Sequence, residues 1–118
     1  MAISSVDMNN TRPWYSERCS FILATSYSGE RRTLSGLATV GISADSCSLN
    51  EGTAASASIG TGIVALMLKV NLSLSWRDVQ HIMVLSAVSE SLLQADNWLR
   101  NGDGLMVSHY FGFGIMNA

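Results

Sequence analysis

One stretch, residues 53–70, limits the folds open to this chain more than any other part of the sequence. It reads TAASASIGTGIVALMLKV, and apolar residues fall almost all the way round a helix drawn with it. Such a pattern is typical of a helix buried on every side. Its first turns hold only small side chains, which let neighbouring backbone approach closely. We therefore expect a central helix from about Thr53 to Val70, with N-terminal amides free to hold developing negative charge.

Composition and charge exclude several classes of protein. The 118 residues are 47% hydrophobic and 14% charged, which predicts one globular unit at most. The net charge is -2, and the arginines are scattered except for the pair Arg31 and Arg32, so we expect no nucleic-acid partner. The apolar run 59–70 is shorter than the roughly 20 residues that cross a bilayer, which predicts no membrane span. The opening MAISSVDMNN lacks the basic flank and apolar core of a secretory signal.

The remaining patterns predict strands around the helix, so the expected fold class is α/β. Residues 20–27 are rich in β-branched and aromatic side chains and predict a strand, and residues 37–42 predict a weaker one. Residues 43–51 are expected to form a loop. Asn-Gly-Asp-Gly at 101–104 predicts a turn, and 106–118 a final strand interrupted by glycines.

A second helix is predicted from SWRDVQHIMVLSAVS, residues 75–89. Ser75 is a suitable N-cap, and Asp78, three residues later, resembles the partner in a capping box. Four apolar side chains recur at helical spacing and are expected to face inward, namely Trp76, Val79, Ile82 and Met83.

Taken without reference to any family, the polar residues give little evidence of catalysis. His81 lies in the second predicted helix and His109 in the last predicted strand, and both are expected to be structural. Asp96 and Asp103 border turns, where solvated capping roles are expected. The three tryptophans are expected to anchor the core, namely Trp14, Trp76 and Trp98.

The cysteines and the glycosylation sequons leave alternatives open. Cys19 and Cys47 are too few for a zinc cluster; two free buried thiols or a mutual disulfide are both compatible with the sequence. Asn9-Asn10-Thr11 and Asn71-Leu72-Ser73 match the N-glycosylation pattern. That match is common by chance and has meaning only in a secreted protein.

Several segments together carry a resemblance to a known family. They are GTAASAS followed by GIVALMLKVNLSLSWRDVQHI, then PWYSERC, LATSYSGE and VSHYFGFGIMNA. In order and spacing they resemble subtilisin-like serine endopeptidases of the kexin and furin-like proprotein convertase group. The resemblance implies a partial subtilisin-like fold, with residues 1–118 as an incomplete C-terminal portion of a peptidase S8 catalytic domain. It also implies descent from a protease that cleaves proproteins after basic residues, in the secretory pathway or outside the cell.

The resemblance also points to an altered nucleophile position. The family's motif is Gly-Thr-Ser-Ala with serine as the nucleophile, and this chain has Ala54 there. A methyl group cannot attack a carbonyl, and Ser56 lies about 200° round the helix. Ser58 stands where the family usually has proline, and the loop 47–52 is one residue shorter. The family's catalytic Asp, catalytic His and oxyanion Asn precede the matching segments, so we expect no proteolysis by this chain.

Calcium and disulfide expectations rest on the same resemblance. Glu17 matches a family position that contributes to a calcium site, and a carboxylate suits that cation. Its family co-ligands lie upstream, so we expect this chain alone to bind calcium weakly if at all. The family also joins the Cys19 and Cys47 positions to upstream cysteines.

Three functional hypotheses follow from these patterns. The first is an inactive convertase fragment, poorly stable and prone to self-association through its exposed core. The second is a pseudoenzyme interaction module that binds convertases or their substrates. The third is an active enzyme whose missing half another chain supplies, which Ala54 argues against.

Overall fold

Two parallel strands lie at the centre of the fold, β1 (Ala2–Val6) and β2 (Ile22–Tyr27). The structure, a computed structural model, describes residues 1–30, 36–43, 45–94 and 97–117. Val6 and Ala24 are fully buried, and Val6 pairs with Tyr27 at the end of the register. The strand predicted over 20–27 is confirmed, whereas β1 was not predicted because its serines obscure the apolar alternation.

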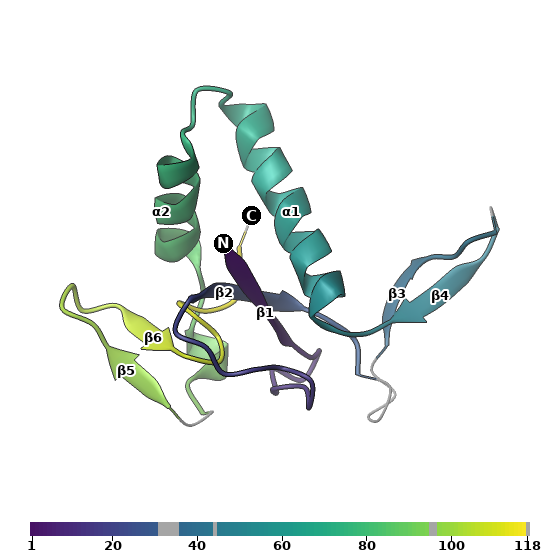
Figure 1. Ribbon diagram of the computed structural model, residues 1–118, viewed down its shortest axis with the longest axis horizontal. Coiled ribbons are helices and arrows are strands. Elements are labelled where there is room, and N and C mark those ends of the chain that lie inside the picture. The colour runs from purple at the N-terminus through teal and green to yellow at the C-terminus, as the bar shows by residue number, and fades with distance from the viewer. Residues whose placement is uncertain (31–35, 44, 95–96, 118) are drawn as a thin grey trace.

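Helix α1 (Thr53–Val70) packs across both of these strands, as Figure 1 shows. It begins after Gly52, whose φ of 97° favours glycine. Its buried residues are small, namely Ala55, Ser56 and Gly60. A Cβ on Gly60 would lie 3.3 Å from Cγ1 of Ile3 and 3.2 Å from Sδ of Met116, so a larger residue would crowd this contact. The predicted helix and its close approach are both confirmed.

The expectation that α1 is buried on every side is wrong for this chain. Only 17% of its residues are buried, and Leu66 and Val70 are 60% and 89% exposed. One face contacts the strands and the second helix, and the described chain leaves the other uncovered. By length and mean hydropathy, 1.5 over 18 residues, α1 could cross a bilayer. Core helices of soluble proteins can have the same length and hydropathy, so these two properties do not assign a membrane span to α1.

Helix α2 (Trp76–Ser86) follows the loop after α1 and runs back beside it (Figure 1). The predicted capping box is confirmed: the amide of Asp78 donates to Oγ of Ser75, and the amide of Ser75 donates to Oδ2 of Asp78. Val79 and Met83 are buried as predicted. Trp76 and Ile82, also expected inside, are 69% and 37% exposed, because the described chain packs only against the Val79 and Met83 side of α2.

The C-terminal segment is not the single strand predicted over 106–118. A 3-10 helix, η2 (Glu90–Leu92), leads to the hairpin of β5 (Trp98–Arg100) and β6 (Met106–Ser108). The predicted turn at 101–104 joins β5 and β6, and Oδ1 of Asn101 accepts from the amides of Asp103 and Leu105. Gly112 then turns the chain at a φ of 60°, against the backbone of Leu23, where a Cβ would collide. β6 ends at Ser108, and Ile115 further along the chain forms an isolated bridge to Thr25 of β2.

Residues 43–51, expected to form a loop, include a strand. β4 (Cys47–Asn50) pairs antiparallel with β3 (Leu37–Val40), which confirms the weaker strand prediction. The amide of Gly41 donates to the carbonyl of Ser46 at 2.7 Å and helps to close this hairpin. All four residues of β4 are exposed, so no buried periodicity marks the strand in the sequence.

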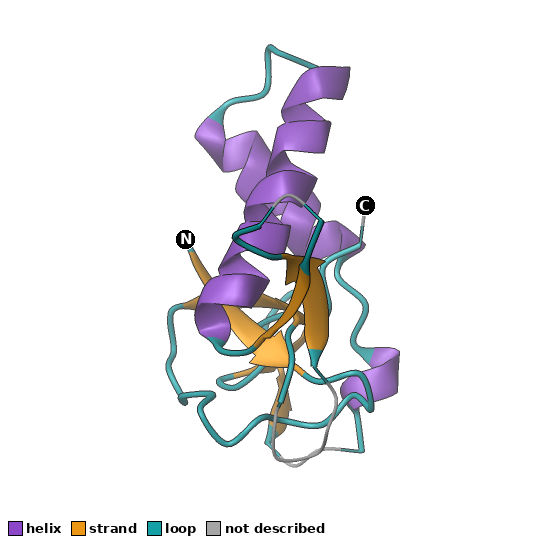
Figure 2. Cartoon of the chain, turned by 90° about the vertical axis from the view of Figure 1, so that its right-hand side faces the viewer, coloured by secondary structure: helices purple, strands orange, loops and turns teal. Residues whose placement is uncertain are grey.

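The core is divided into two small apolar clusters. Val6, Leu92, Phe111 and Ile115 form one, and Ala24, Val79, Met83 and Met116 form the other. Trp98 stacks on Phe111 and is half-buried, but Trp14 and Trp76 are 60% and 69% exposed, so only one tryptophan anchors the core. The two hairpins project from opposite ends of a flat body of 47 × 37 × 20 Å, which Figure 2 shows from the side.

Candidate functional site

The N-terminal end of α1 is the candidate site, because its first two residues are exposed and no side chain caps it. Thr53 and Ala54 are exposed in its first turn, and no side chain caps the helix at Gly52. Oγ of Ser28 donates to the carbonyl of Gly52 at 2.8 Å, which fixes the residue that precedes the helix. Helix N-termini of this kind attract negative charge.

Ala54 and Ser56 occupy opposite environments on this helix. Ala54 is exposed, whereas Ser56 is fully buried. Oγ of Ser56 lies 2.8 Å from Oγ of Ser5 and within 3.1 Å of the carbonyls of Ser26 and Tyr27. The prediction that Ser56 points away from the nucleophile position is therefore confirmed. Ser56 ties α1 to the two central strands and is shielded from any substrate.

A shallow depression of about 310 Å³ lies beside the start of α1. Thr53 lines it together with Tyr15, Glu17 and Cys19. Glu17 is exposed, and the described residues contain no group of three or more His, Cys, Asp and Glu side chains that could hold a metal ion. A calcium site normally takes about six to eight oxygen ligands, so among the described residues Glu17 is not part of an acidic cluster of that kind.

Neither histidine lines this depression. His81 is exposed on α2, and its charge contributes to the lowered pKa of Asp78, after the larger effect of the hydrogen bonds from Ser75. His109 is half-buried, and its carbonyl accepts from the amide of Cys19 at 2.9 Å. The structure thus places the histidines on separate elements and does not bring either to the start of α1.

Two aspartates and two cysteines remain among the residues considered from the sequence. Asp103 is exposed in the β5–β6 turn, as expected, and Asp96 lies outside the described residues. Both cysteines are free, so they form no mutual disulfide. Cys19 is half-buried and Cys47 is exposed, which contradicts the expectation of two buried thiols.

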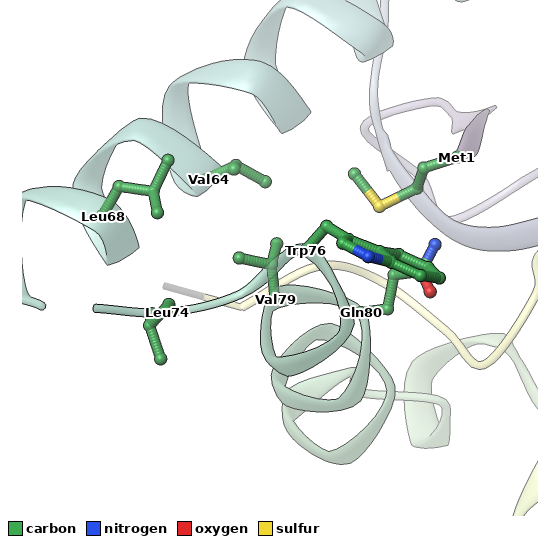
Figure 3. A pocket seen from close by; sticks show the side chains of 7 residues that line it. All are labelled: Met1, Val64, Leu68, Leu74, Trp76, Val79 and Gln80. Carbon is green, nitrogen blue, oxygen red and sulfur yellow. The ribbon is translucent and has the colours of Figure 1, made fainter. Parts of the chain in front are cut away.

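A second concavity lies between the two helices, away from the start of α1. It is a groove of about 490 Å³, shown in Figure 3. Val64 and Leu68 of α1 form one wall, Trp76 and Val79 of α2 form the other, and Met1 closes one side. Its lining is almost entirely apolar, so it is suited to an apolar side chain and not to hydrolytic chemistry.

Comparison with known proteins decides the family. Residues 1–114 match the subtilase family, Peptidase_S8. This chain belongs to the subtilase family. It is 40% identical over 118 residues to furin of Mus musculus, and 44% identical over 119 residues to furin-like protease 1, isoform 1-CRR, of Drosophila melanogaster. Each match covers 100% of this chain but only 15% and 11% of the respective relative. The resemblance to furin-like proteases inferred from the sequence is confirmed.

Solved structures confirm the subtilase fold. The crystal structure of the serine protease of Aeromonas sobria matches 96% of this chain with a TM-score of 0.78, at 17% identity, and the chain covers 27% of that structure. The complex of this protease with its chaperone gives the same TM-score. The partial α/β subtilisin-like fold expected from the sequence is therefore present, although the sequences have diverged.

Sequence reasoning missed the polar residues that secure the start of α1. Ser5 and Ser28 are almost completely buried and bond to Ser56 and Gly52. Serine is usually exposed, so its presence in a strand or loop gives no signal of such a role. Their role is visible only in the structure, where they contact residues that are distant in the sequence.

Proposed function

We propose that this chain is a segment of a furin-like subtilase domain that does not itself hydrolyse peptides. The supporting observation is that Ala54 stands at the family's nucleophile position, exposed beside Thr53 in the first turn, while Ser56 is buried and hydrogen-bonded. Serine nucleophiles act through an exposed hydroxyl and an adjacent base. The exposed methyl of Ala54 offers no hydroxyl, and the described histidines lie elsewhere.

The substrate class and location follow from the relatives by similarity. Relatives named furin and furin-like protease imply proproteins cleaved after basic residues as the ancestral substrates, and the secretory pathway or the extracellular space as the location. The chain spans 15% of the mouse furin that it matches, so activity on such substrates is proposed for the family as a whole and not for this segment.

For calcium, we propose that Glu17 alone binds the ion only weakly. The described residues include no cluster of three or more His, Cys, Asp and Glu side chains, and an exposed carboxylate outside such a cluster gives little affinity.

A second candidate function is supported by the groove between the helices. A pseudoenzyme module that binds convertases or their substrates needs an accessible surface, and the apolar groove of about 490 Å³ provides one. Under this function, labelled dibasic propeptide would bind the wild-type chain and bind less to Leu68→Asn, which removes apolar contact in the groove without adding charge. Equal binding by both proteins, or none, would count against it.

Hydrolysis of a fluorogenic dibasic peptide tests the leading proposal. The purified chain should release no fluorophore above buffer, with mouse furin as the positive control. Ser56→Ala and His81→Ala serve as comparison variants. Release by the wild-type chain above buffer would overturn the proposal, and its loss in a variant that circular dichroism shows to be folded would identify the nucleophile or the base.

A further inference from the structure

The loop between α1 and α2 presents a sequence that an oligosaccharide transferase can use. Asn71, Leu72 and Ser73 form an Asn-x-Ser sequon, and all three residues are exposed. Asn71 is the C-cap of α1, with extended backbone angles of φ -143° and ψ 103°. N-linked glycans are attached to such sequons in surface loops of secreted proteins.

The hydrogen bonds of this loop leave the reactive atoms available. Oδ1 of Asn71 accepts from the amide of Ser73 at 2.9 Å, which forms an Asx turn and leaves Nδ2 directed away from that bond. Among the described residues, neither Nδ2 of Asn71 nor Oγ of Ser73 has a hydrogen-bond partner. The side-chain amide and the hydroxyl two residues later are the groups that define the acceptor site.

The position of the loop allows the folded protein to carry a bulky group. The loop lies at the tip of the helical pair, at the far end of α1 from the central strands (Figure 1). The 18 residues of α1 give a length of about 27 Å at ~1.5 Å per residue, so a glycan here would leave the start of the helix uncovered. It would instead project beside Val70 and Leu72, which are 89% and 87% exposed.

The other sequon is held in a closed turn. The amides of Asn9 and Thr11 both donate to Oδ1 of Asp7, at 2.9 and 2.7 Å, and Asp7 is 1% exposed. The amide of Asp7 in turn donates to the carbonyl of Thr11 at 3.0 Å. These bonds hold the backbone of this sequon around a buried carboxylate, while Asn9 and Thr11 themselves are exposed, so this sequon serves as the internal comparison.

We propose that Asn71 is an N-glycosylation site. This proposal rests on the secretory location proposed above. The donor is an oligosaccharide linked to a lipid pyrophosphate. Nδ2 of Asn71 forms a bond to the anomeric carbon of the first sugar, while the bond from that carbon to the pyrophosphate oxygen breaks. The lipid pyrophosphate leaves with the electron pair, and Nδ2 loses one proton to a base of the transferase.

The experiment separates the site from the natural location of the protein. The full chain is expressed in insect cells behind a cleavable signal peptide, with an artificial C-terminal sequon whose modification proves entry into the lumen. Peptide N-glycosidase treatment is then followed by gel mobility and mass spectrometry. The wild type should carry two glycans and Asn71→Gln one, so Asn71→Gln removes one of two mobility steps.

Further variants identify the acceptor. Ser73→Ala should match Asn71→Gln, while Ser73→Thr and Asn9→Gln should keep both glycans. The proposal is overturned if the wild type carries only the tag glycan, or if Asn9→Gln removes the second glycan and Asn71→Gln does not. Because the signal peptide imposes entry, either result refutes the site without bearing on where the natural protein resides.

Discussion

Oγ of Ser5 and Oγ of Ser56 lie 2.8 Å apart in the buried layer between β1 and α1. These residues are 51 positions apart in the sequence, and their contact joins the first strand to the helix whose exposed first turn contains Ala54. The only serine in the first turn and a half of α1 is thus committed to holding the fold. The Ser56 hydroxyl therefore has a structural role and is not available as a nucleophile.

Removing the Ser56 hydroxyl should destabilise the fold. Ser56→Ala leaves the buried Ser5 hydroxyl and the carbonyls of Ser26 and Tyr27 without this partner, at an expected cost of about 1–3 kcal/mol in unfolding free energy. Ser58→Ala, on the exposed side of the same helix, should change it by less than about 0.5 kcal/mol. Urea unfolding followed by circular dichroism compares the two; equal effects would contradict the structural role of Ser56.

The start of α2 should depend on pH through Asp78. Hydrogen bonds from Ser75, with a smaller contribution from His81, lower the pKa of Asp78 below its usual 3.8. A lowered pKa means that the stabilisation is present above the unfolded value of 3.8 and is lost as pH falls through the folded value. Asp78→Asn should therefore lower thermal stability at neutral pH but not well below pH 3.8. If the melting temperatures of the wild type and Asp78→Asn still differ well below pH 3.8, the stabilisation does not come from the ionised Asp78 carboxylate.

Calcium should leave the melting temperature unchanged. Ligand stabilisation follows RT ln(1 + [L]/Kd), and one exposed carboxylate gives a large Kd. Thermal unfolding with and without millimolar calcium tests this, with Glu17→Gln as the matched variant. An upward shift that Glu17→Gln removes would show that other residues complete a site around Glu17.

The chain should self-associate at high concentration. Its accessible surface is 7484 Å², whereas a compact monomer of 12.7 kDa exposes about 6,200 Å². The outer face of α1 contributes to this surface through Leu66 and Val70, which are 60% and 89% exposed, so Leu66→Lys with Val70→Lys should reduce association. Ser48→Lys, on the exposed β4 strand, controls for added charge. Sedimentation that shows a monomer at all concentrations would contradict this expectation.

Local patterns in the sequence predicted the elements whose signals are local. The apolar periodicity of α1 and the Ser75 and Asp78 cap of α2 depend on residues a few positions apart, and both were located correctly. The turn at 101–104 was likewise marked by its own residues. In these cases the local chemistry and the tertiary fold favour the same structure.

Features that depend on distant contacts were predicted poorly. β4 is exposed along its length and exists because β3 lies opposite, and β1 carries serines that only the contact with α1 buries. The exposure of Trp76 and of the outer face of α1 reflects which neighbours this chain supplies, a property that helical periodicity cannot encode. For the site, Ala54 was located through the family motif, whereas the anchoring role of Ser56 required the structure.

Turnover of a fluorogenic dibasic peptide by the Ala54→Ser protein shows whether this chain lacks only the nucleophile or also the base. Restoring the hydroxyl at the exposed first turn of α1 supplies a nucleophile but no base, because His81 and His109 lie on other elements, and a serine without a base is a weak nucleophile. We predict no turnover above that of the wild-type chain, with mouse furin as the positive control. Turnover by Ala54→Ser that is lost when His81 or His109 is also replaced would contradict the account.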